Sequence, residues 1–336
     1  TRQLLAELFH FSKCKNVNFT PNVTTSLNFI LKGFLKPGDH ILVSAMEHNA
    51  VMRPVVQLAS SGISFDRIPC RTDGSMILEK VEELIRPETK AIVTLHASNV
   101  CGTRMPLDAL GEICQRHQLY FVVDSAQTAG IVPINMDKMH IDALAFTGHK
   151  GLRGPQGTGG FLVSQELAEQ MEPLISGGTG SVSHTEEIPD FMPDRFESGT
   201  PNLPGIYGLH EALLYLKTHS LQAINEKELS LTGYFLEQLQ ALDDTGRHIR
   251  IIGKKDLTNR NAVVSIQTPE IDMSQVAWQL DNEYGVMTRV GLHCAPNAHK
   301  TLGTYPAGTI RFSFGPENTK NELDFAIQGL KKILDL

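Results

Sequence analysis

The sequence has 336 residues, with 30 Lys and Arg against 37 Asp and Glu and a formal net charge of -7. This length allows two domains, or one large domain with an appendage, each with an ample core. The charges are interspersed without a basic block, which argues against nucleic acid as a partner. No apolar run reaches the ~18 residues of a membrane span, and the N-terminus lacks a signal-peptide pattern. We therefore expect a cytoplasmic protein with no membrane partner.

The cysteines are scattered, odd in number and free of any C-x-x-C pair. They are Cys14, Cys70, Cys101, Cys114 and Cys294. Neither a disulfide framework nor a metal site is expected from this usage. Four of them are typical of small buried hydrophobic residues. Cys294 differs because of the residues around it, which are considered below.

Strands and helices alternate along the first part of the chain. A helix from about residue 24 has apolar residues at i, i+3, i+4 and i+7, which places them on one face. Expected strands lie at 18–20, 40–44, 64–69, 91–96, 120–124, 143–146 and 161–163, and further helices at 50–61, 77–85 and around 107–114. This alternation predicts right-handed crossovers and a largely parallel sheet, hence an α/β fold.

The character of the chain changes after residue 163. Residues 176–194 contain Gly, Ser and Pro without periodicity and are typical of a mobile surface segment. Long helices then follow at 205–218 and 221–243. Strands at 262–267, 286–289 and 309–314 and helices at 274–283 and 320–334 complete a smaller α+β unit. We predict two domains, 1–215 and 216–336.

Two apolar runs in the middle of the chain end in reactive side chains. Tyr120-Phe121-Val122-Val123 leads into Asp124, and Ala143-Leu144-Ala145-Phe146 leads into Thr147-Gly148-His149-Lys150. In an α/β sheet the ligand crevice lies at the carboxyl ends of the strands, so the acid and the amine can share one pocket. Pyridoxal phosphate needs a lysine for its aldehyde, an acid for its ring nitrogen and donors for its phosphate.

These two strand ends resemble paired elements of the class V aminotransferases, and within them the cysteine desulfurases. Asp124-Ser125-Ala126-Gln127 matches Asp-x-x-Gln, and Thr147-Gly148-His149-Lys150 matches Ser/Thr-Gly-His-Lys. The resemblance implies pyridoxal 5'-phosphate as cofactor on Lys150. Asp124 would contact its ring nitrogen, Gln127 its ring hydroxyl, and Thr147 with His149 its phosphate. It also implies a fold-type I PLP-dependent transferase, with a mainly parallel seven-stranded sheet and a smaller C-terminal α+β domain.

Three earlier elements also resemble the family. Thr24 or Thr25 is a natural cap for the helix that follows, and the amides of a helix N-terminus bind anions. The family places its cofactor phosphate on a Thr here, which we take as Thr25 beside Thr24. His48 follows a strand and would stack on the cofactor ring, and Asn99 would contact the ring hydroxyl and the substrate. Without the resemblance, an ordinary cap, a surface histidine and a loop residue explain these positions.

Phe196-Glu197-Ser198-Gly199-Thr200-Pro201-Asn202 resembles the family's Glu-x-Gly-Thr-x-Asn element. In members of the family the Gly-Thr pair reaches the cofactor phosphate of the neighbouring subunit. The resemblance therefore implies a homodimer with shared active sites, to which Gly199 and Thr200 contribute.

Arg289-Val290-Gly291-Leu292-His293-Cys294-Ala295 follows an expected strand and precedes a stretch without clear periodicity. A thiol in such a loop is expected to be partly exposed, and a nearby histidine or arginine favours the nucleophilic thiolate. The pattern resembles the cysteine-bearing segment of the short-loop (type II) cysteine desulfurases, whose thiol accepts sulfur. An inert thiol on another class V enzyme is the alternative.

Arg311 lies on an expected strand, and its guanidinium can bind a planar carboxylate through two hydrogen bonds. Position in the family favours Arg311 as the clamp for the substrate carboxylate, with Arg289 as a second contact. A solvated charge on the strand is the alternative. The family usually carries some dozens of residues before the first helix, so we expect this sequence to be a fragment.

The resemblance implies conversion of L-cysteine to L-alanine, with the sulfur moving to Cys294 as a persulfide and then to an acceptor protein. Lys150, Cys294 and His48 would be catalytic. A selenocysteine lyase, a cystine lyase or an aminotransferase is the nearest alternative, because these activities occur on the same scaffold. A non-catalytic partner protein with this fold is disfavoured, since Lys150, Asp124, His48 and Cys294 are all present.

Overall fold

Two separate β-sheets organise the chain, which a computed structural model describes over residues 1–336. The larger sheet has seven strands in the order β1-β7-β6-β5-β4-β2-β3. Its strands are β1 Val17–Thr20, β2 His40–Ser44, β3 Ser64–Ile68, β4 Thr89–Leu95, β5 Tyr120–Asp124, β6 Ala143–Thr147 and β7 Gly159–Val163. Pairing is parallel from β3 to β6 and antiparallel where β7 joins β6 and β1. The predicted α/β class and mainly parallel sheet are confirmed.

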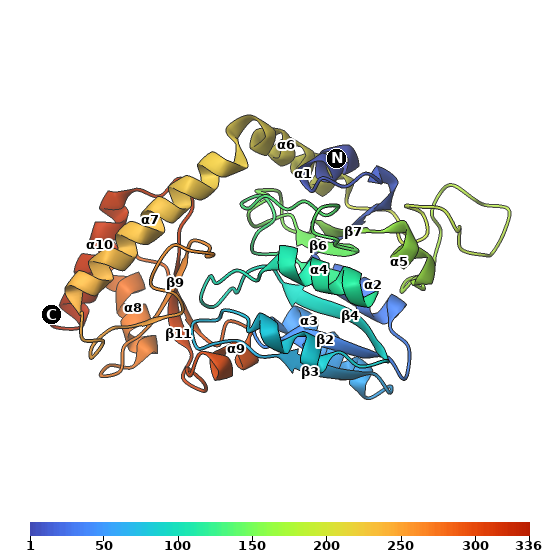
Figure 1. Ribbon diagram of the computed structural model, residues 1–336. Helices are drawn as coiled ribbons and strands as arrows, with labels where there is room; N and C mark the ends of the chain where they lie inside the picture. Colours follow the sequence, from blue (N-terminus) through green and yellow to red (C-terminus); the bar gives the residue numbers. More distant parts are fainter.

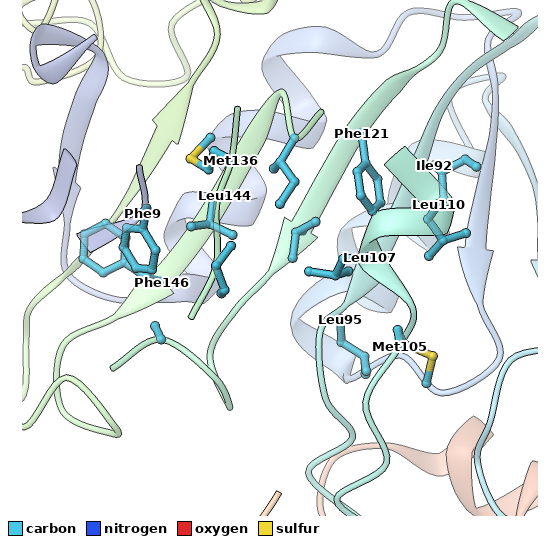
Figure 2. Close-up of a cluster of buried hydrophobic side chains, with 14 of the residues drawn as sticks. Phe9, Ile92, Leu95, Met105, Leu107, Leu110, Phe121, Met136, Leu144 and Phe146 are labelled. Atoms are coloured by element: carbon cyan, nitrogen blue, oxygen red, sulfur yellow. The ribbon is translucent and has the colours of Figure 1, made fainter. Parts of the chain in front are cut away.

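Helices cover both faces of this sheet, because successive side chains of each strand point to opposite faces. One layer is formed by α2 Val23–Phe34, α3 Asn49–Ala59 and α5 Gln165–Gln170, and the other by α1 Arg2–Leu8, α4 Leu107–His117 and α6 Leu203–His219. Figure 2 shows part of the second layer, where Phe121 of β5 and Ile92 of β4 lie close to Leu110 of α4. Each buried aromatic or aliphatic side chain here contributes about 1.5–3 kcal/mol to folding.

The smaller sheet has the order β10-β11-β9-β8 and is antiparallel throughout. Helix α7 crosses to it from the end of α6 (Figure 1). Helix α9 Pro296–Thr301 comes from the same part of the sequence but packs against the core of the larger sheet. The unit around the smaller sheet contains β8 Arg250–Ile252, β9 Val263–Gln267, β10 Arg289–Gly291, β11 Thr309–Ser313, α7 Leu221–Leu242, α8 Met273–Tyr284 and α10 Lys320–Ile333. It has its own core of 15 buried residues, all from Leu231 onward. The predicted boundary at residue 216 falls within α6, and the exact division stays a prediction.

The helix expected at 77–85 is wrong. The chain there forms two short 3-10 helices, η2 Leu78–Lys80 and η3 Glu82–Leu84. Apolar residues recur at 78, 81 and 84, and a spacing of three aligns side chains on a helix with three residues per turn. Val81 is buried between the two turns. Pro87 then disfavours α-helical backbone at the residue before it, so the segment stays short.

The strand expected at 286–289 lies later, at β10. The Val286 N–H bonds to the carbonyl of Leu280 at 2.8 Å, and Gly285 adopts a left-handed conformation with φ 63°. These residues therefore end helix α8, and only the residues after Thr288 pair with β11.

The short elements α5, α9 and β8 were not predicted. Residues 176–194 contain no helix or strand, as expected. No helix of the chain has both the length and the apolar character that crossing a membrane requires.

Candidate active site

A cavity of about 400 Å³ lies between the carboxyl ends of the large sheet's strands and the smaller sheet. Both units contribute to its walls. Seven of the predicted site residues line it: His48, Asn99, Gln127, Lys150, Arg289, Cys294 and Arg311. A narrow recess next to it shares four of these residues and adds Asp124. The structure thus brings together residues from both ends of the sequence, from His48 to Arg311.

Asp124 and Lys150 lie in the recess, at the ends of adjacent strands. Asp124 is buried, its Oδ1 accepts a hydrogen bond from the Ala126 N–H at 2.9 Å, and burial raises its pKa. Desolvation lowers the pKa of Lys150, with a further lowering by Arg311 that Asp124 opposes. Lys150 is nevertheless exposed to solvent, since it borders the open cavity. A lowered pKa favours the neutral amine, which is the form that attacks an aldehyde.

His48 is the N-cap of α3, and its Nδ1 accepts a hydrogen bond from the Ala50 N–H at 3.0 Å. The neutral ring therefore carries its proton on Nε2. Desolvation, together with the charges of Lys150 and Arg53, lowers the pKa of His48 to about 4. The imidazole is consequently neutral near pH 7, as an aromatic ring that stacks on a cofactor would be.

Asn99 fastens the Cys294 loop to the large sheet. Its side-chain Nδ2 donates to the backbone carbonyl of His293 at 2.7 Å. The backbone carbonyl of Asn99 accepts from Nη1 of Arg311 at 3.0 Å. Its Oδ1 is buried without a partner, and so is Nε of Arg311. An unpaired buried polar atom carries a desolvation penalty that a bound ligand would relieve.

The Cys294 loop has an unusual backbone. His293 and Cys294 are both in the left-handed region, with φ 48° and 58°. Such strain persists where surrounding contacts fix it. The Asn49 N–H at the start of α3 donates to the carbonyl of Cys294 at 2.8 Å, and the Ala295 N–H donates to that of Leu292 at 2.9 Å. The result is an exposed thiol on a fixed loop beside the cavity.

The neighbouring His293 does not supply a cation for that thiol. Its ring is buried against Thr309, with Nε2 2.9 Å from Oγ1 of that residue. Burial, followed by the charge of Arg311, lowers the pKa of His293 to about 3, so the ring is neutral. The guanidiniums of Arg289 and Arg311 line the same cavity as Cys294.

The cap expected at Thr24 or Thr25 is wrong, since α2 begins at Val23 and its cap is Asn22. Asn22 has extended backbone, and its Oδ1 accepts from the Thr25 N–H at 3.0 Å. Thr24 borders a small opening that it shares with His48 and Cys294, whereas Thr25 lines a different pocket. Of the two threonines, Thr24 is therefore on the His48 side.

The remaining residues predicted to contact the phosphate are not in the main cavity. Oγ1 of the buried Thr147 lies 3.1 Å from Nδ1 of His149, which is exposed. Gly199 and Thr200 are exposed and line a separate pocket together with Thr25. Their roles toward a phosphate stay predictions.

Two cavity residues were missed from the sequence. Glu228 of α7 is buried at the cavity wall, and desolvation raises its pKa to about 7. Asn261 precedes β9 and is also buried there. Glu228 sits in a charged helical stretch, Glu226-Lys227-Glu228, in which nothing distinguishes the buried acid from its exposed neighbours. No motif surrounds Asn261.

The recess and cavity fit pyridoxal phosphate. Lys150, with its lowered pKa, and the buried acid Asp124 share the recess, and the neutral imidazole of His48 lines its wall. Oδ1 of Asn99 and Nε of Arg311 are buried without a hydrogen-bond partner and could bind a ligand. In the free chain, burial favours the protonated form of Asp124. The protonated ring nitrogen of a bound cofactor beside Asp124 would favour the carboxylate instead.

The model of the family described as aminotransferase class-V matches residues 1–325, so this chain belongs to that family. A probable cysteine desulfurase of Halalkalibacterium halodurans is 32% identical to it, over 98% of this chain and 80% of that protein. A probable cysteine desulfurase of Staphylococcus aureus is 33% identical, with the same coverage. The family predicted from the sequence is confirmed.

Solved structures agree with this assignment. The apo structure of a cysteine desulfurase from Thermococcus onnurineus NA1 matches with a TM-score of 0.92 and 31% identity, over 99% of this chain and 82% of that one. The S-sulfonic acid form of the cysteine desulfurase CsdA from Escherichia coli matches with a TM-score of 0.89 and 28% identity, with the same coverage. These relatives are probable cysteine desulfurases and these two structures are of cysteine desulfurases, which supports an enzyme of this class and the predicted fold.

Proposed function

We propose that this chain is a pyridoxal-phosphate-dependent cysteine desulfurase that converts L-cysteine to L-alanine and takes up the sulfur on Cys294. The observation that carries the proposal is the exposed thiol of Cys294 on the wall of the cavity that Lys150 also lines. Other class V activities need the lysine and the acid but not this thiol. The similarity to cysteine desulfurases over nearly the whole chain supports the same conclusion.

Within this proposal, Lys150, Asp124, His48 and Gln127 would hold the cofactor, which when bound supplies an electron sink for charge that develops at the substrate Cα. Asp124 would keep a proton on the ring nitrogen, and His48 would stack as a neutral ring. Arg311, with Arg289 beside it, binds the substrate carboxylate. The amine of Lys150 then removes the Cα proton.

The Cys294 thiolate attacks the substrate sulfur. A sulfur–sulfur bond forms and the substrate Cβ–S bond breaks, with its electron pair left on carbon. The substrate's thiol proton remains on the transferred sulfur, and proton delivery to carbon yields alanine. The net change is cysteine plus the Cys294 thiol to alanine plus a Cys294 persulfide, which is balanced without any added oxidant. An acceptor protein thiol would then remove the persulfide sulfur in the cytoplasm.

A homodimer would complete this site. Gly199 and Thr200 line a pocket away from the cavity of their own chain, and the nearby helix α6 exposes large apolar residues, Tyr207 among them with 71% of its surface accessible. Covering such side chains is a common reason for association. Gly199 and Thr200 would then reach the cofactor phosphate of the partner.

The test is product analysis after adding pyridoxal phosphate. The proposal expects equal amounts of alanine and persulfide sulfur from L-cysteine, with the extra sulfur mass found on Cys294 when no reductant is present. Pyruvate and ammonia from cystine, with no mass gain on Cys294, would instead indicate a cystine lyase and would overturn the proposal.

A further inference from the structure

The side chain of Asn261 links the smaller unit to the loop that carries Gln127. Its Nδ2 donates to the Gln127 backbone carbonyl at 2.6 Å, and its Oδ1 accepts from Nε of Arg104 at 2.6 Å. The guanidinium can only donate and the carbonyl can only accept, so the orientation of the amide is fixed from both sides. Asn261 is 5% exposed.

The Gln127 carbonyl depends on this contact. No backbone N–H pairs with it, and the amide of Ile131, four residues further on, bonds to the carbonyl of Thr128 instead. Gln127 borders both the cavity and the recess, and it is three residues beyond Asp124. Holding its carbonyl sets the direction in which the Gln127 side chain leaves the main chain.

The same segment of the smaller unit holds the loop that carries Asn99. The Asn261 N–H donates to the carbonyl of Gly102 at 2.8 Å, and the Arg104 N–H donates to that of Asn259 at 2.9 Å. Gly102 has φ 76°, and a Cβ there would lie 2.9 Å from the Asn261 carbonyl oxygen. The approach is therefore close enough to require glycine. Two loops that border the cavity are anchored on one residue.

The guanidinium of Arg104 that donates to Asn261 is charged. Its Nη2 donates to Oδ1 of Asn225 at 2.8 Å, and burial lowers its pKa to about 10, with Glu228 opposing that shift. The guanidinium is thus a cation at neutral pH. A hydrogen bond from a cation is stronger than one between neutral groups, which stiffens the Asn261 amide.

We propose that Asn261 is a positioning residue for the reaction: anchored by Arg104, it holds the Gln127 main chain so that the Gln127 side chain meets the cofactor ring hydroxyl. This inference rests on the proposed function. Asn261 acts through Gln127 and takes no part in a bond-making step.

The test is a double-mutant cycle with Gln127→Ala and Asn261→Asp, read as the dissociation constant of pyridoxal phosphate and as the pH midpoint of the bound cofactor's absorbance change. Asn261→Asp keeps the size and the acceptor for Arg104 but removes the N–H donor. We expect Asn261→Asp alone to raise the dissociation constant about three- to tenfold, the range for one lost hydrogen bond. It should also shift the absorbance midpoint. When Asn261→Asp is combined with Gln127→Ala, it should cause neither change beyond the effect of Gln127→Ala alone. The reason is that both substitutions remove the same contact, that of the Gln127 side chain with the cofactor.

Asn225→Ala is the matched control, since it removes the other amide partner of Arg104 and should leave both readouts unchanged. Arg104→Gln enters the same cycle as a second variant and should move both readouts in the same direction as Asn261→Asp, so the inference stays testable even if Asn261→Asp does not fold. Full additivity with Gln127→Ala, or unchanged readouts in a folded Asn261→Asp, would overturn the positioning role. Absence of cofactor binding by the wild type would overturn the proposed function, and the inference with it.

Discussion

Arg289 and Arg311 lie opposite each other in the antiparallel ladder between β10 and β11, and neither is in an ion pair with a carboxylate of the chain. Burial, and then the charge of Arg289, lowers the pKa of Arg311. Two adjacent cations without a counter-charge form a site for an anion, because a bound carboxylate relieves their repulsion.

Arg311→Lys should therefore weaken substrate binding. The substitution keeps a charge but loses the planar pair of donors. Loss of a charge-assisted hydrogen bond of about 1.5–3 kcal/mol corresponds to a rise in KM for L-cysteine of about 10- to 100-fold, with a smaller change in kcat. Steady-state kinetics measures this, and Arg250→Lys, at the exposed first position of β8, is the control. An unchanged KM would remove Arg311 from the substrate site.

Cys294→Ala should separate cofactor binding from sulfur transfer. The variant keeps Lys150 and the recess, so the absorbance of the bound cofactor should persist. Alanine production from L-cysteine should fall at least about 100-fold, because the nucleophile is gone. Cys14 is exposed rather than buried as the sequence predicted, and Cys14→Ala, which removes this other exposed thiol, should behave as the wild type. Wild-type turnover in Cys294→Ala would refute the persulfide mechanism.

Glu228 predicts a pH dependence of substrate binding. With its pKa raised to about 7, it is mostly protonated below that pH and ionised above it. An ionised Glu228 adds a negative charge to the wall of the cavity that Arg289 and Arg311 also line, and this charge disfavours a carboxylate ligand there. KM for L-cysteine should thus rise as the pH increases from 6 to 7.5, and Glu228→Gln should flatten this rise. Glu226→Gln, on the exposed face of the same helix, should retain it. A rise of equal size in Glu228→Gln would contradict this role.

His96 predicts a pH dependence of stability. It is buried with Nδ1 3.0 Å from Oγ1 of Thr128, and burial lowers its pKa to about 3, against 6.5 when unfolded. The unfolded chain therefore binds more protons between these values, so stability is lost as the pH falls below about 6.5. Relative to His96→Gln, the wild type should lose up to about 1.4 kcal/mol per pH unit in that window. Urea unfolding of the apo-proteins between pH 7 and 5 measures the difference, and a constant difference would contradict it.

Much of the large sheet could be predicted from the sequence because its signals are local. The apolar runs before Asp124 and Lys150, and the helical spacing after residue 24, each follow from a few neighbouring residues. The 3-10 turns around Val81 were missed because their apolar spacing of three was taken for that of an α-helix. The displacement of β10 was missed because the hydrogen bond from Val286 to Leu280 is not visible in a sequence pattern.

The residues of the candidate site also fall into those that a motif predicts and those that only the structure reveals. Residues in motifs, such as Lys150, Asp124, His48 and Cys294, could be found from the sequence, and the fold brings them to adjoining spaces. Glu228 and Asn261 could not, because their roles depend on burial and on contacts between the two sheet units. The position of Thr24 beside His48, and of Thr25 in a different pocket, likewise could be seen only in the folded chain.

The central claim is that the amine of Lys150 binds an aldehyde cofactor. Borohydride converts the reversible bond between such an amine and the aldehyde into a stable one, and peptide mass analysis then locates it. After incubation with pyridoxal phosphate and reduction, the account predicts one cofactor per chain, on the peptide that contains Lys150, and none in Lys150→Ala. A stable adduct on a different lysine, or no adduct at all, would contradict it.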